Sequence, residues 1–348
     1  MTKKIIALLL TAVISVTAFT ACSSGKKSYL TDENGNPVKV DTIVTIDGEN
    51  VSLEELRYYI LNSKDYYEQS FLQAGQDPAA FWTENPDMMD MIKEQSLQTM
   101  VFARAIKKYA GQHDIKLTAE EKRTVTNEID NGIKENGSPS KYDAVLEKQF
   151  MTRGLYKALR EDQLLQQKLQ KVMLAPGSAI APTAEEVKDY LIKNYLRAKH
   201  ILISTQGITD EAELAAKTEL AEKALARAKA GEDFDALIAE YGEDPGTSSN
   251  PDGYIFPEGQ MVTEFYEGTK ALKVGEISGI IKSDFGIHII NRLPLDDAYF
   301  EANKATLENM VCTELAGPKL DEELKALMDS LKVVKSPEYD KINSTNLK

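Results

Sequence analysis

The chain of 348 residues is 42% hydrophobic and 28% charged, which suits two or three folded domains and argues against wholesale disorder. It carries 41 Lys and Arg residues against 55 Asp and Glu residues, giving a formal net charge of −14. Nucleic-acid binding depends on neutralising phosphates, so a surface this acidic argues against a nucleic-acid-binding protein, and we expect no such partner.

The N-terminus has the pattern of a lipoprotein signal peptide. Two lysines precede an apolar run at 5–19, which is too short for a regular membrane span. Small residues just before Cys22 resemble a bacterial lipobox, although Phe19 stands where Leu is usual. We therefore predict a signal peptide at 1–21 and, at 22–41, an acylated Cys22 followed by a flexible tether. The alternative is a transmembrane helix that ends at a cysteine by chance.

Once Cys22 is acylated, the other cysteine, Cys312, has no second cysteine in this sequence with which to form a disulfide. We therefore expect neither a disulfide framework nor a cysteine-based metal site. Because Cys312 lies in a helical pattern, we predict a small, buried hydrophobic side chain at this position.

A hairpin followed by helices is predicted for residues 42–196. Asp47-Gly48 between two extended apolar segments is typical of a two-residue hairpin turn. Three later helix starts have the spacing of a capping box: Ser52 with Glu55, Thr118 with Glu121, and Thr183 with Glu186. The one histidine here, His113, is expected to be solvated or to cap a helix end. We assign most of the aromatic and Met side chains to the core and the rest to a groove for apolar peptide segments.

The helical pattern returns over residues 295–335. Gly317-Pro318 should kink or break this helix, and 331–334 is a strand candidate that can pair with the hairpin strand at 43–46. The two ends of the chain would then form one discontinuous helical domain into which the central part is inserted. We predict that residues 336–348 form a frayed tail.

The central residues 197–294 change to a mixed pattern of strands and helices. Two of the three histidines interrupt apolar strands near its two ends, His200 in 198–204 and His288 in 287–292. If these strands pair, the two imidazoles come together.

Six motifs in this unit resemble parvulin-type peptidyl-prolyl isomerases in their order and spacing. They are RAKHIL (197–202), GEDFDAL (231–237), EDPG (243–246), GQMV (259–262), VGEIS (274–278) and FGIHII (285–290). With its lipobox and helical flanks, the whole chain resembles extracytoplasmic foldase lipoproteins of the PrsA type. The resemblance implies an α+β fold, in which a four-stranded antiparallel sheet wrapped by helices is inserted in a mostly helical domain.

The same resemblance implies the site residues. The catalytic candidates are His200, Asp244 and His288. The proline-accepting pocket is implied at Met261, Phe265 and Phe256, with Ser283 near its edge. The chain departs from the family at 250–255, where Asn-Pro-Asp-Gly-Tyr-Ile replaces the usual Gly-Gly-Asp-Leu-Gly. The resemblance therefore does not give the shape of the site wall that this segment forms.

Rotation about an X-Pro bond meets a barrier of about 18–20 kcal/mol from amide resonance, and lowering it needs neither a covalent nucleophile nor a metal. We expect no cofactor. Alternatives to catalysis are a merely structural histidine pair in an inactive parvulin fold, a zinc site, which lacks further ligands, and a Ser-His-Asp hydrolase, which lacks a nucleophile elbow. The loop at 204–210 contains no Lys or Arg, which disfavours phosphoserine-directed recognition.

The sequence thus predicts a peptidyl-prolyl isomerase, anchored by Cys22 to the extracytoplasmic face of the cell membrane, that assists the folding of exported proteins with X-Pro bonds. The alternative is a non-catalytic holdase that binds unfolded chains in its helical lobe and keeps the parvulin domain as a scaffold. A homodimer through the helical lobes is compatible with the sequence, which contains no specific motif for it.

Overall fold

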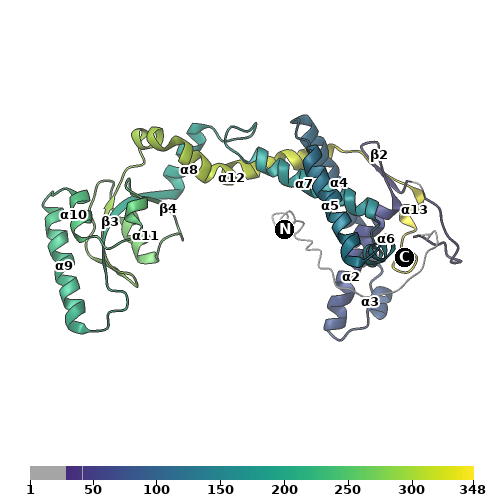
Figure 1. Ribbon diagram of the computed structural model, residues 1–348, viewed down its shortest axis with the longest axis horizontal. Coiled ribbons are helices and arrows are strands. Elements are labelled where there is room, and N and C mark those ends of the chain that lie inside the picture. Colours follow the sequence, from purple (N-terminus) through teal and green to yellow (C-terminus); the bar gives the residue numbers. More distant parts are fainter. Residues whose placement is uncertain (1–28, 41) are drawn as a thin grey trace. The chain divides into compact units, whose positions relative to one another are not determined.

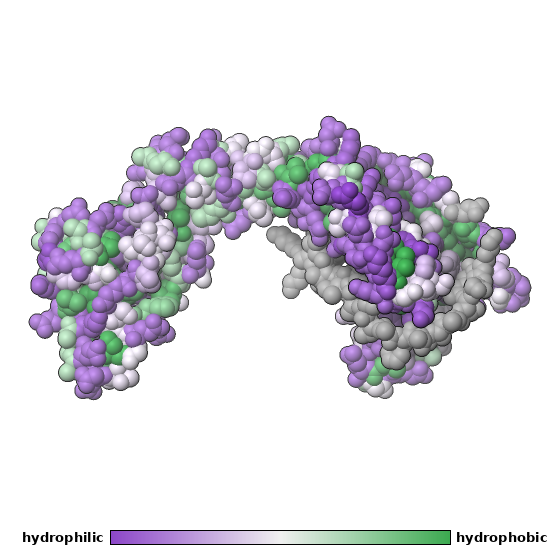
Figure 2. Space-filling model, viewed as in Figure 1, coloured by the Kyte–Doolittle hydropathy of each residue, from purple (hydrophilic) through white to green (hydrophobic). Residues whose placement is uncertain are grey.

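A computed structural model describes residues 29–40 and 42–348 (Figure 1). The chain divides into two compact units, one made of Met1–Met173 with Pro318–Lys348 and the other of Leu174–Gly317. The predicted signal peptide and Cys22 lie outside the described residues. Within the described part, no helix is both long and apolar enough to cross a membrane. Figure 2 shows hydrophilic residues over much of the visible face of each unit, as expected from the many charged residues.

A small sheet joins the two ends of the chain in the first unit. Strands β1 (Val44–Ile46), β2 (Glu49–Val51) and β7 (Val333–Lys335) are antiparallel, in the order β2-β1-β7. Asp47 and Gly48 form the hairpin turn with φ of 51° and 84°, the left-handed conformation that this turn type requires. The predicted hairpin and the predicted pairing of the C-terminal strand with it are therefore confirmed.

Helices account for most of this unit. They are α2 (Leu53–Gln73), α3 (Pro78–Glu84), α4 (Asp87–Gln112), α5 (Ala119–Asn136), α6 (Pro139–Lys148), α7 (Arg153–Met173) and the short α13 (Pro337–Asp340). Ser52 caps α2 by accepting the N–H of Glu55 at 3.1 Å, while the Glu55 carboxylate pairs with Arg104 at 2.7 and 2.9 Å. The capping boxes that begin with Thr118 and Thr183 are complete. His113 is the C-cap residue of α4.

Two segments that we predicted to be flexible are folded. Leu30 and Leu347 form an isolated antiparallel bridge, and their side chains are only 1% and 5% exposed. The N–H of Lys348 donates to the carbonyl of Tyr29 at 2.9 Å. The prediction of flexibility is therefore wrong for 29–40 and for the tail at 336–348, because apolar residues of both segments complete the core of this unit.

The second unit contains a four-stranded antiparallel sheet in the order β4-β3-β6-β5, as the α+β prediction requires. Its strands are β3 (Tyr195–Ser204), β4 (Tyr254–Pro257), β5 (Ile281–Ser283) and β6 (Gly286–Arg292). Its helices are α8 (Ala184–Asn194), α9 (Glu211–Lys229), α10 (Phe234–Tyr241), η2 (Thr247–Ser249) and α11 (Thr263–Ala271). Helices α9 and α10 cover one face of the sheet and α11 the other (Figure 1).

Two details of this unit differ from the sequence prediction. Helix α8, which we placed in the N-terminal helical lobe, packs its buried Val187 and Leu191 against Leu307 within the second unit. The strand expected at 277–281 is displaced to β5. The first part of the expected strand, at 277–280, forms only an isolated bridge between Ile277 and Asn291. The pairing is irregular here because the Ser278 hydroxyl, rather than a backbone carbonyl, accepts the N–H of Ile290 at 2.8 Å.

Helix α12 (Asp297–Ser330) is continuous through Pro318, so of the predicted kink or break at Gly317-Pro318, the break is wrong. Its beginning belongs to the second unit and its end to the first. Buried residues on both sides of the proline, such as Val311 and Leu320, give packing energy that offsets the hydrogen bond lost at Pro318. Cys312 is buried in this helix, as predicted.

Candidate active site

The register of β3 and β6 brings the two histidines together. His200 lies opposite Ile290 and His288 opposite Leu202, so the histidines are diagonal neighbours on the same face of the sheet. Their Nδ1 atoms are 3.1 Å apart, and the rings are nearly parallel, with an interplanar angle of 12°. The prediction that strand pairing joins the imidazoles is confirmed.

Asp244 reaches this pair from the loop that follows α10. The N–H of Glu243 donates to the carbonyl of Leu202 at 2.8 Å, and the Glu243 carboxylate accepts the N–H of Ser204 at 2.6 Å. Lys217 holds the same carboxylate at 2.6 Å. The loop is thus fixed to the end of β3, which places Asp244 Oδ2 2.8 Å from His200 Nε2.

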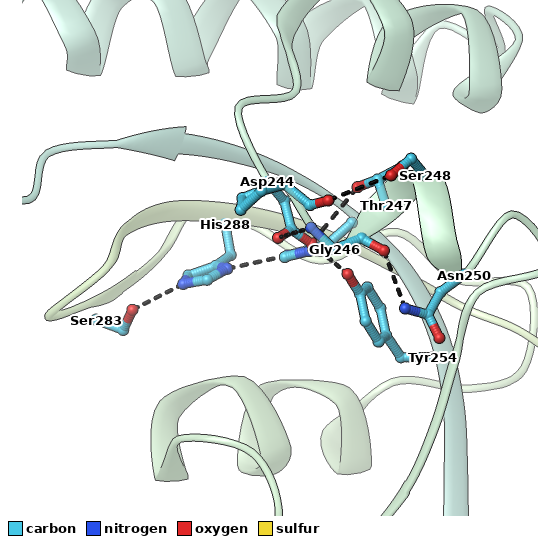
Figure 3. A network of polar contacts seen from close by, with 10 residues as sticks. Asp244, Gly246, Thr247, Ser248, Asn250, Tyr254, Ser283 and His288 are labelled. Carbon is cyan, nitrogen blue, oxygen red and sulfur yellow. Dashed lines mark hydrogen bonds and ion pairs between the residues drawn. The ribbon is translucent and has the colours of Figure 1, made fainter.

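The hydrogen bonds of the site form a chain with one consistent direction (Figure 3). An ionised Asp244 only accepts, so the Nε2 of His200 carries a proton and, in the neutral ring, its Nδ1 accepts from the Nδ1–H of His288. The remaining His288 nitrogen, Nε2, then accepts from the Ser283 hydroxyl at 2.7 Å. Ser283 in turn accepts the N–H of Phe285 at 3.2 Å. Each hydrogen bond in this series therefore has a defined donor and a defined acceptor.

This arrangement requires both imidazoles to be neutral, and their surroundings favour that state. His200 and His288 are only 8% and 4% exposed. Burial lowers the pKa of His200, an effect that the hydrogen bond and charge of Asp244 partly offset. Burial, together with the neighbouring His200, lowers the pKa of His288 to about 4. Both rings are therefore neutral at pH 7.

Tyr254 is a further member of the site that the sequence analysis missed. Its hydroxyl donates to Asp244 Oδ2 at 2.6 Å, while Gly246 N–H donates to Oδ1 at 3.0 Å. Burial would raise the pKa of Asp244, but these donors and His200 outweigh it and hold the pKa below its usual value. Burial and the bond to Asp244 raise the pKa of Tyr254. The sequence did contain one indication of this role. Side chains alternate between the two faces along a strand, so Tyr254 lies on the same face of β4 as the predicted pocket residue Phe256.

An apolar cluster lies directly beside the polar chain. The Phe265 ring meets His200 and His288 edge-on, at centroid distances of 5.1 and 5.5 Å. Phe256 packs against Phe265 at 5.5 Å and is fully buried, whereas Met261 is half-buried in the same cluster. The predicted pocket residues are thus together, with Met261 more accessible than the two phenylalanines. Ser283 lies at the end of β5, on the histidine side of the sheet.

Comparison with known proteins agrees with this geometry. Residues 185–293 match the family described as "PPIC-type PPIASE domain", and residues 1–170 match the "SurA-like N-terminal domain". Residues 185–293 therefore form a domain of the PPIC-type peptidyl-prolyl isomerase family. All the residues of the parvulin site described above lie within 185–293.

Over its whole length the chain resembles PrsA foldases. It is 26% identical to the foldase protein PrsA of Caldanaerobacter subterraneus over 349 residues, which cover 98% of this chain and 99% of that protein. It is 40% identical to the PrsA of Geobacillus kaustophilus over 114 residues, or 32% of this chain and 36% of the relative. With the PrsA of Bacillus subtilis it shares 30% identity over 209 residues, or 57% of this chain and 65% of the relative.

The parvulin site itself consists of two histidines, one carboxylate and two hydroxyl groups beside an apolar cluster. In the described part of the chain, no group of three or more His, Cys, Asp or Glu side chains is arranged to hold a metal ion. The site places hydrogen-bonding groups with defined donor and acceptor roles next to apolar side chains. Such an arrangement is suited to binding an amide and stabilising one of its conformations.

Proposed function

We propose that this protein is a peptidyl-prolyl cis-trans isomerase that assists the folding of exported proteins, with His200, Asp244 and His288 as its catalytic residues. The observation that carries the proposal is the directed chain of hydrogen bonds through two neutral histidines, in a domain of the parvulin family. The foldase role follows from the similarity to PrsA foldases over nearly the whole chain.

The reaction is rotation about the X-Pro amide bond. In the planar amide the nitrogen lone pair is delocalised into the carbonyl, and this delocalisation is lost at the twisted midpoint. Met261 and Phe265 would bind the pyrrolidine ring, while the polar chain that ends at Ser283 would face the amide. Polar groups that favour the twisted amide over the planar one lower the barrier, and each 1.4 kcal/mol of such preference accelerates rotation about tenfold.

The neutral histidines fit this reaction. A charged imidazolium would lose its hydration in this buried site at a cost in free energy, whereas a neutral hydrogen-bonded ring avoids that cost. The formal charge in this hydrogen-bond network is that of the Asp244 carboxylate. It already accepts hydrogen bonds from His200 Nε2, the Gly246 N–H and the Tyr254 hydroxyl. Isomerisation involves no proton transfer to solvent, so a fixed network is sufficient.

Exchange NMR on a short X-Pro peptide tests the proposal with the full-length chain. We expect the wild-type protein to accelerate cis-trans exchange and His200→Gln to reduce that acceleration at least tenfold. His113→Gln is the matched control, because His113 caps a helix in the other unit and should leave the rate unchanged. If the wild-type protein leaves the exchange at its uncatalysed rate, the isomerase proposal is wrong.

We further propose that Cys22 is acylated and anchors the protein to the extracytoplasmic face of the cell membrane. The support is the sequence pattern of a short apolar run that ends in small residues before a cysteine. Cells that express the wild-type protein should incorporate labelled palmitate into it, and Cys22→Ser should abolish the label. Equal labelling of Cys22→Ser and wild type would show that the cysteine is not the anchor.

A holdase activity in the helical unit is a second candidate, favoured by apolar side chains that are exposed near the end of α2. Tyr66 and Leu72 are 70% and 56% exposed, next to an aromatic group that includes Phe71 and Phe81 at 3.8 Å. In an aggregation assay with an unfolding client, Tyr66→Ser combined with Leu72→Ser should weaken protection while His200→Gln should not. Equal protection by all three proteins would contradict a holdase surface at this place.

The same unit is where a homodimer would form. We keep this arrangement as an expectation, and sedimentation velocity measurements over a range of protein concentrations test it. A single monomeric species at all concentrations would contradict it.

A further inference from the structure

We propose that Tyr254 is a positioning residue of the isomerase site: its hydroxyl holds the Asp244 carboxylate on His200 and thereby fixes the direction of the whole hydrogen-bond chain. This inference rests on the proposed isomerase function and adds to it a residue outside the expected catalytic set.

The first support is that Tyr254 and His200 share one oxygen atom. Asp244 Oδ2 receives the Tyr254 hydroxyl at 2.6 Å and the His200 Nε2 proton at 2.8 Å. The Tyr254 ring also meets the His200 ring edge-on, with centroids 5.6 Å apart and planes at 85°. The Tyr254 side chain therefore contacts both Asp244 and His200, the first two residues of the hydrogen-bond network.

The second support is the space that the backbone leaves for the hydroxyl. A Cβ atom at Gly246 would collide with the Tyr254 hydroxyl oxygen, and it would lie 3.3 Å from Asp244 Oδ1. Gly246 has a φ of −75°, which any residue can adopt, so glycine is favoured here by its small size rather than by its flexibility. The loop that contains Asp244 and Gly246 therefore leaves space for the Tyr254 hydroxyl.

The third support is the firm attachment of the segment that enters β4. The Arg197 guanidinium donates to the carbonyl of Asp252 at 3.0 and 2.6 Å, and it stacks on the Tyr299 ring at 3.6 Å. At Gly253, φ is 89°, and a Cβ there would come within 2.9 Å of the carbonyl oxygen of Ala198. The backbone position of Tyr254 is thus fixed independently of its own hydrogen bond.

The consequence concerns the proton on His200. While Asp244 is ionised it only accepts, so His200 must donate from Nε2 and accept at Nδ1. If Asp244 gains a proton, it can donate to Nε2 instead, and the chain through His288 to Ser283 can reverse. The other hydroxyl near Oδ2, that of Thr247, is 3.4 Å away and is a weak substitute. Tyr254 therefore protects the direction of the chain at mildly acidic pH.

The test is Tyr254→Phe in the full-length chain, with Tyr266→Phe as the matched control. Tyr266 lies in the same apolar cluster on α11, so its variant also removes one phenol oxygen from this unit. NMR of the Asp244 carboxyl carbon should show its titration midpoint raised by about one pH unit in Tyr254→Phe, which is a tenfold change in proton affinity, and unchanged in Tyr266→Phe. The imidazole nitrogen shifts of His200 should change over the same pH range.

The pH profile of isomerisation supplies the second measurement. In Tyr254→Phe the acidic limb of this profile should move to higher pH by the same amount as the Asp244 titration, about one pH unit. The isomerisation rate above pH 7 should change less. Gly246→Ala keeps the hydroxyl but displaces it and should shift the profile in the same direction, so it serves where Tyr254→Phe does not fold.

Two results would overturn the proposal. One is an Asp244 titration that is the same in Tyr254→Phe and wild type. The other is a rate that falls equally at every pH, which would indicate a merely structural role. The carbon and nitrogen measurements need no turnover, so a wild-type protein without isomerase activity would refute the proposed function while still deciding whether Tyr254 positions Asp244.

Discussion

The two faces of the four-stranded sheet are built from the same strands and do different work. The face under α9 and α10 carries an apolar cluster in which four isoleucines pack against alanines of α9: Ile201, Ile203, Ile287 and Ile289. On the other face the same two central strands carry His200 and His288. Alternation along each strand directs the isoleucines of the core to one face and the proposed catalytic histidines to the other. Variants on the two faces should therefore separate stability from activity.

The largest expected effect is on stability, from Ile289→Ala on the α9 face. Ile289 is fully buried, so removing its branched side chain should lower the free energy of unfolding by about 3 kcal/mol. Urea unfolding measures this loss, and the isomerisation rate of the folded protein should be unchanged. Ile192→Ala, at a residue that is 52% exposed, should cost less than about 1 kcal/mol. Similar losses for both variants would contradict the assignment of this face to stability.

A smaller effect is expected from pH, and it arises on the histidine face. The pKa of His288 is about 4 in the folded protein, against about 6.5 in an unfolded chain, so the unfolded state binds more protons between these values. The stability is therefore complete above pH 6.5 and is lost as the pH falls toward 4, by roughly 2–3 kcal/mol. The lowered pKa of His200 acts in the same direction.

Urea unfolding at pH 7.5 and 4.5 checks this dependence. His288→Asn removes the titrating ring, so its stability should fall less between the two pH values than that of the wild type. The depressed pKa of Asp244 acts at lower pH, because a lowered carboxyl pKa costs stability only as the pH falls through it. Equal pH dependence in the wild type and in His288→Asn would show that His288 is not neutral in the folded protein.

The smallest expected effect comes from Ser283→Ala, at the far end of the hydrogen-bond chain. Loss of one donor to His288 should reduce the isomerisation rate up to about tenfold and the unfolding free energy by about 1 kcal/mol. The neighbouring Lys282 is exposed, and alternation directs it away from the histidine face, so Lys282→Ala is a suitable control with no change in rate. A normal rate in Ser283→Ala would restrict the functional chain to Asp244 and the two histidines.

Features that depend on local signals could be predicted from the sequence. The Asp47-Gly48 turn needs only the conformational tolerance of two residues, and the capping box at Thr118 needs only four. The meeting of His200 and His288 followed from two strand patterns and one assumption of pairing. These predictions succeeded because each depends on the pattern within one or two short segments.

Features that depend on distant partners could not be predicted. Alternation along β4 gives the face on which Tyr254 lies, but it does not give the partner of its hydroxyl, Asp244, which belongs to the loop after α10. Leu30 is ordered by Leu347, a residue at the other end of the chain. The continuity of α12 through Pro318 reflects packing on both sides of the proline, which overrides a strong local signal.

The diagonal pairing of β3 and β6 also bears on how the protein itself folds. His200 and His288 are separated by 88 positions, and a register slip of one residue would turn every side chain of one strand to the opposite face. Closing so long a loop is slow compared with forming the neighbouring helices. The site therefore exists only in a chain in which the most distant strand pair of the four-stranded sheet has already formed in the correct register. A copy of the protein without this strand pair carries no assembled histidine pair.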